Sequence, residues 1–427
     1  MKEIKIIDTD LMGRGIGKID GKAVFVKGAV TGDVVLYETI ESKKRYDIGK
    51  LSKVITPSDH RITPLCPVFE NCGGCSFLHI DRQLESDIKI KAVESAFRRA
   101  GIGNITPEKI LTGKNTGYRN KAVFHLNNDG SYGFYESESR IGTSCENCLL
   151  IPDSFAETIR IIEKFNKNKS SVVLPESIML REGRGEIMLV AEVKKFGQCS
   201  YLLKNIFDSC DSIVSVYECI GYPLSHEAEF NHLHGIESII TEFAGLDLKI
   251  SPKSFFQVNT EIAEMMCSEI CDHLDPKSGD TILDLYCGIG TIGLTVAKRF
   301  PYVNVIGVEI NESAVTDAKE NCTLSHITNA EFICSDAGRT NLSDISPYAA
   351  IVDPPRYGLT DTMISGIIDL SPEILVYMSC NPSTLAGDSV KLIGGGYRID
   401  KVIAGDMFPG CPHIESLVFF KKNKTDA

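Results

Sequence analysis

Near its C-terminal end the sequence carries a cysteine and a glutamate whose side-chain chemistry suits covalent catalysis. Cys380 lies in the run Ser379-Cys380-Asn381-Pro382, and Glu415 ends the run Pro412-His413-Ile414-Glu415. A thiolate can add to an electron-poor carbon, and a carboxylate can remove a proton from the resulting adduct. Taken alone, a single cysteine is more often a buried, inert side chain, and a single glutamate is usually a surface charge. The two motifs therefore need a structural context before either residue can be given a role.

A glycine-rich run upstream is typical of a site where the backbone approaches a nucleotide-like ligand. The run Asp284-Leu285-Tyr286-Cys287-Gly288-Ile289-Gly290-Thr291-Ile292-Gly293 ends one apolar stretch, and Glu309 ends the next. Glycines let the chain turn sharply before a helix, and the later carboxylate can accept hydrogen bonds from two ribose hydroxyls. The same pattern serves NAD, FAD and S-adenosylmethionine, and an ordinary tight turn also produces it.

Two acidic positions further along favour S-adenosylmethionine among these ligands. Asp336 follows the third apolar stretch, where it can meet an adenine amine, and Asp353-Pro354-Pro355-Arg356 follows the fourth. Two successive prolines fix the backbone just beyond a strand end, which is where open α/β sheets bind their ligands. A rigid loop without a ligand is the alternative interpretation of the proline pair.

A second group of residues suited to chemistry is a tight run of cysteines in the first third of the chain. Cys66 is followed by Cys72-Gly-Gly-Cys75, and Cys145 and Cys148 are the nearest later cysteines. Four thiolates suit either a [4Fe–4S] cluster or structural zinc, and free thiols are the third interpretation. The spacing favours the cluster over zinc, and zinc over free thiols.

The elements that position the C-terminal motifs follow the rhythm of a doubly wound parallel sheet, beginning at about residue 245. Apolar stretches alternate with helical patterns, which is the βαβ signature of an α/β fold of the Rossmann type. The expected strands are residues 281–286, 303–308, 330–334, 349–352 and 374–378, and the expected helices are residues 292–299 and 313–322.

Two further domains are expected before this one. Residues 1–56 alternate apolar and polar side chains with frequent glycines, which predicts a small β-barrel of the OB-like kind. Residues 57–244 mix short strand-like runs with turns and contain a predicted helix over 81–100, so we expect an α+β middle domain. The catalytic domain then spans residues 245–427.

The overall composition is that of a globular protein without a membrane span. Hydrophobic residues make up 43% of the 427 positions and charged residues 24%. The acidic residues near the start do not fit a signal peptide, so we expect a cytoplasmic protein, and we expect a monomer. The net charge of −12 argues against a polyanionic partner. The charge is uneven, however, because residues 1–55 hold eleven Lys and Arg against eight Asp and Glu.

Five motifs, in their order along the chain, resemble the RNA uracil-5-methyltransferases, S-adenosylmethionine-dependent enzymes that make 5-methyluridine. They are Phe255-Phe256-Gln257-Val258-Asn259 and the segments 284–293, 353–358, 379–382 and 412–415. The resemblance covers almost the whole chain and implies that Cys380 is the nucleophile and Glu415 the base. The cofactor pocket that it implies consists of Gln257, Tyr286, Gly288, Glu309, Asp336 and Asp353. The family often has His-Thr where this chain has Gly410-Cys411, and this departure keeps His413 as an alternative base.

These residue types also fit the chemistry of that reaction. Uracil C5 is a weak nucleophile, and addition of a thiolate to C6 produces an enolate whose C5 is electron-rich. The reaction then needs a base near C5 and a group that favours the enolate oxygen, for which the sequence offers Arg356 or Asp353. The target base must also be unstacked from its helix to reach the site.

The same resemblance suggests which RNA is bound. The N-terminal barrel resembles the RNA-binding TRAM domain, and Tyr118-Arg119-Asn120-Lys121-Ala122 matches a family motif that either faces RNA or forms a polar turn. The ribosomal-RNA members carry the same cysteine run and a distant cysteine followed by aliphatic residues, which Cys148-Leu149-Leu150-Ile151 matches better than Cys145 does. The basic residues expected to contact phosphates are Lys43, Lys44, Arg45, Lys50 and Lys53.

We therefore expect a 23S rRNA (uracil-C5)-methyltransferase with a [4Fe–4S] cluster, or zinc, on Cys66, Cys72, Cys75 and Cys148. A tRNA (uracil-C5)-methyltransferase is the alternative within the family. An iron–sulfur oxidoreductase that uses NAD at the glycine-rich loop is the alternative from another class.

Overall fold

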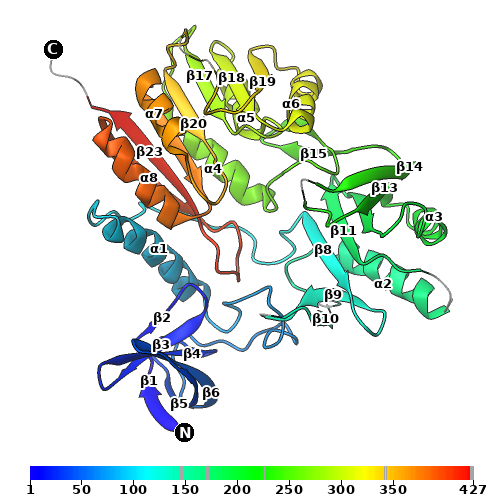
Figure 1. Ribbon diagram of the computed structural model, residues 1–427, viewed down its shortest axis with the longest axis vertical. Helices are drawn as coiled ribbons and strands as arrows, with labels where there is room; N and C mark the ends of the chain where they lie inside the picture. The colour runs from blue at the N-terminus through cyan, green and yellow to red at the C-terminus, as the bar shows by residue number, and fades with distance from the viewer. Residues whose placement is uncertain are drawn as a thin grey trace.

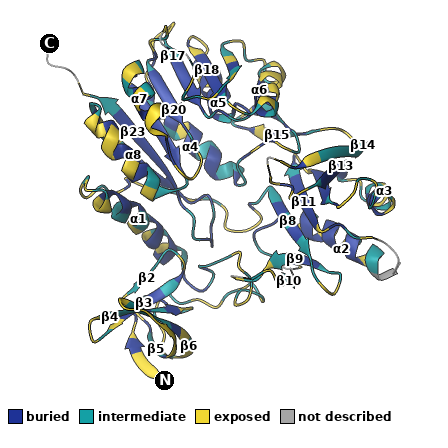
Figure 2. Ribbon diagram, viewed as in Figure 1, coloured by how far each residue is buried: buried dark blue, intermediate teal, exposed yellow. Residues whose placement is uncertain are grey.

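The computed structural model describes residues 1–137, 139–144, 146, 148–168, 173–225, 227–340, 342 and 344–423. Cys145, one of the two alternatives for the fourth cysteine ligand, lies outside the described residues. Figure 1 shows three parts in chain order: a curled N-terminal sheet, a middle sheet with helices, and a larger C-terminal sheet with helices. Figure 2 shows that the strands of the two larger sheets are mostly buried.

The N-terminal part is a six-stranded curled sheet in the order β1-β5-β6-β4-β3-β2. Three register shifts between β5 and β6 increase the local twist and help the sheet to curl around a small apolar core. Gly15 and Gly17 allow close packing, because a Cβ at either position would lie within 3 Å of neighbouring atoms. The strands are β1 (Lys2–Lys5), β2 (Asp8–Thr9), β3 (Arg14–Ile19), β4 (Lys22–Lys27), β5 (Val34–Ser42) and β6 (Tyr46–Thr56).

The predicted helix after the cysteine run forms as α1 (Arg82–Arg99), and Asp81 caps it by accepting a hydrogen bond from the Leu84 N–H at 2.8 Å. Its apolar face packs with α8 (Pro382–Gly394) of the C-terminal part, and β7 (Ile110–Leu111) joins the C-terminal sheet beside β22 (Tyr397–Gly405). Residues 57–244 therefore contribute strands to three sheets, and the expected domain boundaries stay predictions.

The middle sheet has seven strands in the order β10-β9-β8-β11-β12-β13-β14. Helices α2 and α3 cover one face and share its apolar core. The elements are β8 (Lys121–Leu126), β9 (Tyr132–Tyr135), β10 (Gly142–Ser144), α2 (Asp153–Asn168), β11 (Ser177–Gly183), β12 (Glu186–Glu192), α3 (Ser200–Ser209), β13 (Ile213–Ile220) and β14 (Glu229–Gly235).

The C-terminal sheet confirms the α/β expectation. Its eight strands follow the order β19-β18-β17-β20-β21-β23-β22-β7, and the first five are parallel. Apolar side chains of α4, α5 and α6 pack on one face, and those of α1, α7 and α8 on the other. A hairpin of β15 (Ile239–Phe243) and β16 (Leu246–Ile250) precedes the sheet. The remaining elements are α4 (Thr260–His273), β17 (Thr281–Leu285), α5 (Thr291–Arg299), β18 (Asn304–Glu309), α6 (Glu312–Leu324), β19 (Ala330–Cys334), β20 (Ala349–Val352), α7 (Asp361–Leu370), β21 (Ile374–Ser379), α8 (Pro382–Gly394), β22 (Tyr397–Gly405) and β23 (Glu415–Lys422).

Among the helices formed by the described residues, none is both long enough and apolar enough to cross a membrane.

Candidate active site

Cys380 and Glu415 come from neighbouring strands of the C-terminal sheet and lie at the end of the sheet where β21 finishes and β23 begins. Cys380 directly follows β21, and Glu415 begins β23, which runs antiparallel to β21 with Ser379 opposite Ser416. The same register makes positions 380 and 415 neighbours. Cys380 is half-buried, and Glu415 is only 6% exposed. Residues separated by 35 positions in the sequence are thus placed side by side by strand pairing.

The loop after β20 lies against the turn that carries Cys380. The Arg356 carbonyl accepts hydrogen bonds from Asn381 Nδ2 at 3.0 Å and from Thr384 Oγ1 at 3.4 Å. The Arg356 side chain is close enough to the Cys380 thiol for its charge to favour the thiolate. Arg356 is thereby placed where it can stabilise negative charge on the sulfur or on a bound ring.

Burial and clustered acids determine the protonation states at this edge. Burial, followed by the charge of Asp353, raises the pKa of Glu415 well above its usual range. Burial, followed by the charge of Asp284, raises the pKa of Asp353 to about 7. Burial and Glu415 raise the pKa of the Cys380 thiol, and Arg356 opposes that effect. Burial therefore favours the protonated forms of these acids in the protein alone, and the charge of Arg356 opposes that effect at Cys380 and Glu415.

The glycine-rich loop forms a cradle with open space in front of it. Gly288 and Gly290 have φ values of +54° and +85°, and a Cβ on Gly288 would meet no atom within 4 Å. Buried Asp284 accepts a hydrogen bond from the Gly293 N–H at 2.7 Å. Its other oxygen, Oδ1, has no hydrogen-bond partner among the described residues. A buried carboxylate oxygen beside an open loop suits a ligand that brings a donor, such as the amino group of S-adenosylmethionine.

The other predicted cofactor residues lie on the ends of neighbouring elements. Glu309 ends β18 and accepts hydrogen bonds from the backbone N–H groups of Gly288 at 3.1 Å and Asn311 at 2.8 Å. Asp336 lies in the turn after β19 with 47% of its side chain exposed. Half-buried Tyr286 follows β17 with a φ of +70°.

Gln257, the remaining predicted cofactor residue, lies in the segment before α4. Its carbonyl accepts a hydrogen bond from Asn120 Nδ2 at 2.8 Å, and its side chain is half-buried.

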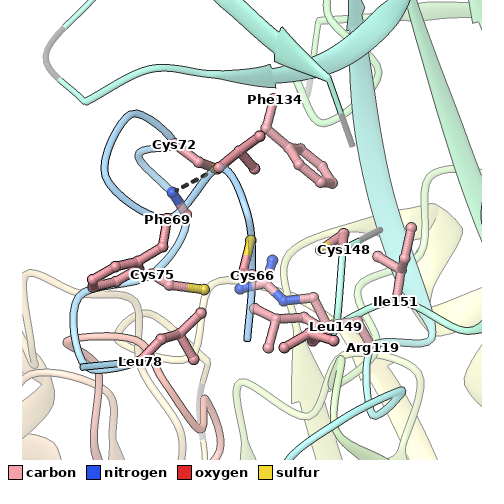
Figure 3. Close-up of a pocket in the computed structure, with 13 residues that line it drawn as sticks. Cys66, Phe69, Cys72, Cys75, Leu78, Arg119, Phe134, Cys148, Leu149 and Ile151 are labelled. Carbon is pink, nitrogen blue, oxygen red and sulfur yellow. Dashed lines mark hydrogen bonds between the residues drawn. The ribbon is translucent and has the colours of Figure 1, made fainter. Parts of the chain in front are cut away.

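A separate apolar pocket is lined by the four predicted metal ligands Cys66, Cys72, Cys75 and Cys148 (Figure 3). Leu78, Phe69 and Phe134 contribute to its apolar wall. Within the described ranges, no three His, Cys, Asp or Glu side chains are grouped as a single metal ion would require.

The donor set around these sulfurs nevertheless fits a thiolate-bound group. The Gly74 N–H donates to Cys72 Sγ at 3.4 Å, and the backbone N–H groups of Leu150 and Ile151 are close enough to Cys148 to lower the pKa of its thiol. Burial raises the pKa of Cys148, but these donors and nearby Arg119 favour its thiolate. Hydrogen bonds to sulfur from the backbone are a usual feature of iron–sulfur and zinc sites.

Two residues in and beside the cysteine pocket make contacts that the sequence did not predict. Arg119, in the motif that was expected to face RNA or form a polar turn, is half-buried and donates to Cys411 Sγ at 3.5 Å. Cys411 lies beside the pocket, is 2% exposed, and donates its thiol hydrogen to the Gly74 carbonyl at 3.0 Å. The only sequence signal for Cys411 was the departure from the family pattern at residues 410–411.

The comparisons with known proteins agree with this geometry. A family model described as tRNA (Uracil-5-)-methyltransferase matches residues 244–423. An uncharacterized RNA methyltransferase from Bacillus cereus is 31% identical over 98% of this chain and 96% of its own length. Another from Staphylococcus aureus is 30% identical over 97% of this chain and 96% of its own length.

Among solved structures, the Pyrococcus abyssi tRNA (uracil-54, C5)-methyltransferase in complex with S-adenosyl-L-homocysteine is similar along the whole chain. It superposes with a TM-score of 0.81 at 26% identity and covers 98% of this chain and 99% of its own.

Proposed function

The chain belongs to the S-adenosylmethionine-dependent RNA uracil-5-methyltransferase family, and we propose that it methylates C5 of a uridine in 23S ribosomal RNA through a covalent Cys380–C6 adduct. The family assignment decides against the iron–sulfur NAD oxidoreductase alternative. The observation that carries the proposed mechanism is the convergence of Cys380, Arg356 and Glu415 from three separate elements at one edge of the sheet.

The proposed sequence of steps uses each of these side chains. The Cys380 thiol gives its proton to water, which the charge of Arg356 favours, and the thiolate adds to C6 as the electron pair of the C5–C6 double bond moves toward O4. Asp353, which can be protonated near neutral pH, or Arg356 stabilises that oxygen. C5 then attacks the methyl group, and S-adenosylhomocysteine leaves. The Glu415 carboxylate removes the C5 proton, and the double bond forms again as the thiolate is expelled.

The cofactor is proposed to bind along the edge that carries Gln257, Tyr286, Gly288, Glu309, Asp336 and Asp353. The open space at Gly288 and the unpaired Asp284 Oδ1 support this placement. S-adenosylmethionine supplies the methyl group, and these residues orient it toward the Cys380 edge.

Cys66, Cys72, Cys75 and Cys148 are proposed to hold a [4Fe–4S] cluster, with zinc as the alternative. Their shared pocket and the N–H donors to sulfur support a thiolate-bound group. Anaerobic purification followed by iron, sulfide and zinc analysis tests the proposal. About four irons and four sulfides per chain are expected, whereas stoichiometric zinc without iron would reject the cluster.

The choice of RNA is tested by mapping the modified nucleotide. Total RNA from a strain that lacks the gene is incubated with the enzyme and labelled S-adenosylmethionine, and 5-methyluridine is located by primer extension. Label in 23S rRNA is the expected result. The solved structure of a tRNA (uracil-54, C5)-methyltransferase makes tRNA the second candidate, and label confined to tRNA would support it. Absence of 5-methyluridine from both would contradict the proposed function.

A further inference from the structure

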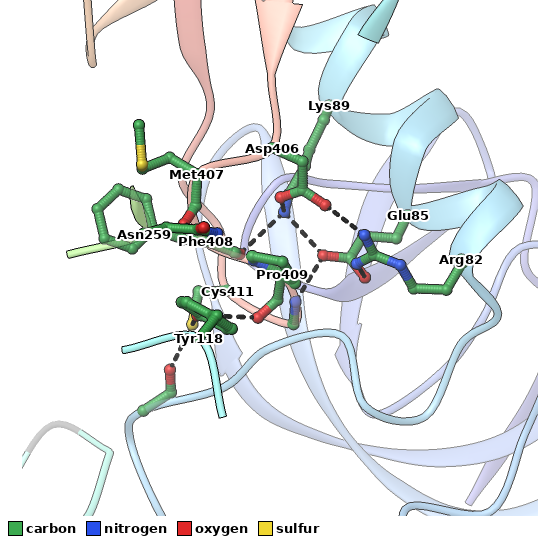
Figure 4. Close-up of polar contacts among 12 residues, drawn as sticks. Arg82, Glu85, Lys89, Tyr118, Asn259, Asp406, Met407, Phe408, Pro409 and Cys411 are labelled. Carbon is green, nitrogen blue, oxygen red and sulfur yellow. Dashed lines mark hydrogen bonds and ion pairs between the residues drawn. The ribbon is translucent and has the colours of Figure 1, made fainter. Parts of the chain in front are cut away.

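The loop between β22 and β23, residues 406–414, carries His413 and leads directly into Glu415. Its first residue, Asp406, is fully buried and pairs with Lys89 Nζ at 2.5 Å and Arg82 at 2.7 Å (Figure 4). Farther along, the Gly410 N–H donates to Glu85 Oε1 at 2.7 Å. Helix α1 therefore holds the loop through buried, charge-assisted hydrogen bonds, which are strong and directional.

The cysteine run holds the same loop on its other side. The backbone N–H groups of residues 76–77 both donate to the Gly410 carbonyl, at 2.8 and 3.0 Å. The Cys411 thiol donates to the Gly74 carbonyl at 3.0 Å, and Cys411 belongs to a small apolar cluster against which Cys75 and Cys148 pack. The segment 74–77, which includes the proposed metal ligand Cys75, is therefore the part of the cysteine run that the 406–414 loop contacts.

The fit between the two segments is close. Gly410 has a φ of +79°, and a Cβ there would lie 3.0 Å from Leu78 Cδ2. Two further hydrogen bonds reach the loop: Tyr118 Oη donates to the Pro409 carbonyl at 3.2 Å, and Arg119 donates to Cys411 Sγ at 3.5 Å. Movement of the cysteine run would therefore move the loop, because close-packed contacts transmit displacement.

We propose that Cys411 is a positioning residue that couples the cysteine pocket to the catalytic base, so that the pocket's bound metal holds the 406–414 loop in the geometry that Glu415 needs. This inference rests on the proposed function for the role of Glu415. It assigns the cysteine pocket to support of the active site, in addition to any support of an RNA-binding surface.

The first test measures the loop without using activity. Hydrogen–deuterium exchange of the full-length protein is compared before and after removal of its metal with a chelator. Amides of residues 407–414 are expected to exchange at least tenfold faster in the stripped protein, whereas those of β21 are unchanged. Unchanged exchange at residues 407–414 would overturn the coupling, whatever the RNA substrate proves to be.

The second test asks whether Cys411 carries the coupling. Cys411→Ala is compared with Cys199→Ala, because both thiols are 2% exposed and donate to a backbone carbonyl, and Cys199 lies in the middle part. Cys411→Ala should retain the wild-type metal content and an RNA KM within twofold, but its kcat should fall about tenfold as a covalent enzyme–RNA adduct accumulates. Cys411→Ser, which keeps a donor for the Gly74 carbonyl, should recover part of kcat.

Accumulation of the adduct separates positioning of the base from a general loss of structure. A loosened fold in the variant would slow adduct formation and methylation together. If the proposed function is wrong, the wild-type enzyme itself will form no adduct and methylate no uridine. Wild-type turnover by Cys411→Ala, or a defect in KM alone, would overturn the role of Cys411. Chelation should have little further effect on kcat in Cys411→Ala, and a full additional loss would also overturn it.

Discussion

At the scale of single residues, Cys380 and Glu415 have distinct roles that substitution can separate. Cys380→Ala should abolish both methylation and the adduct with 5-fluorouracil RNA, because no thiolate remains to add to C6. Glu415→Gln should lower kcat by about 10²–10⁴-fold while the adduct persists, since proton removal follows addition. Gel shifts that survive denaturation measure the adduct. Normal turnover by Glu415→Gln together with a stalled His413→Ala would transfer the role of base to His413.

Asp353 should destabilise the fold as the pH rises. Its pKa is about 7 in the folded protein and near 3.8 ordinarily, so between these values the folded state binds more protons than the unfolded chain. Stability is therefore lost as the pH rises through this window. Asp353→Asn removes this proton-linked loss, so the variant should be more stable than the wild type at high pH. Its advantage in the free energy of unfolding should be about 2 kcal/mol larger at pH 8 than at pH 5. Urea unfolding without cofactor measures it, with exposed Asp369→Asn as the control.

The predicted residues differ in how much the sequence could say about them. Motifs at strand ends, such as those of Glu309 and Cys380, were placed correctly on their elements because parallel strands bring their carboxyl ends to one edge. The position of Cys411 could not be predicted. It lies in a loop, which has no periodic pattern, and the residues that it contacts, Cys75 and Arg119, are hundreds of positions away in the sequence.

At the scale of elements, α1 shows the same limit. The sequence predicted this helix from its periodicity, and its apolar residues Leu84, Ile88, Val93, Ala96 and Phe97 are all buried. The sequence did not predict which sheet α1 packs against, because an apolar stripe on a helix does not specify the surface that it covers. The structure packs it beside α8 and uses its charged residues to hold the 406–414 loop.

That attachment should be costly to break. Lys89 Nζ is fully buried and contacts Glu85 Oε1 at 2.7 Å, Asp406 Oδ1 at 2.5 Å and the Phe408 carbonyl at 3.0 Å. Lys89→Met leaves two buried carboxylates short of a cation and should lower the free energy of unfolding by about 3–5 kcal/mol. Lys391→Met is the matched control, because its pair with Asp361 is exposed and should contribute at most about 1 kcal/mol. Equal effects in urea unfolding would contradict the importance of the buried cluster.

At the scale of the whole molecule, the net charge of −12 must be reconciled with an RNA substrate. The basic residues expected to contact phosphates are all exposed in the curled sheet, on β6 and in the loop between β5 and β6. Lys43 is paired with Glu41 at 2.5 Å, whereas residues 44 and 45 have no ion pair within the described part of the chain. A local basic surface on an acidic protein favours selective contact over general coating of RNA.

This arrangement predicts how RNA binding depends on salt. The double variant Lys44→Ala/Arg45→Ala should bind RNA more weakly. It should also reduce the steepness of log K against log salt concentration by about 0.7 for each phosphate that the protein no longer neutralises, because fewer counterions are released on binding. Lys204→Ala, on the exposed face of α3 and paired with Asp208, is the control and should change neither quantity. Filter binding between 50 and 200 mM salt, roughly the range over which this effect is large, measures both. An unchanged slope in the double variant would place the phosphate-binding surface elsewhere than on the curled sheet. Because these side chains belong to the curled sheet and not to the elements that carry Cys380 and Glu415, the variant's kcat at saturating RNA should stay at the wild-type value.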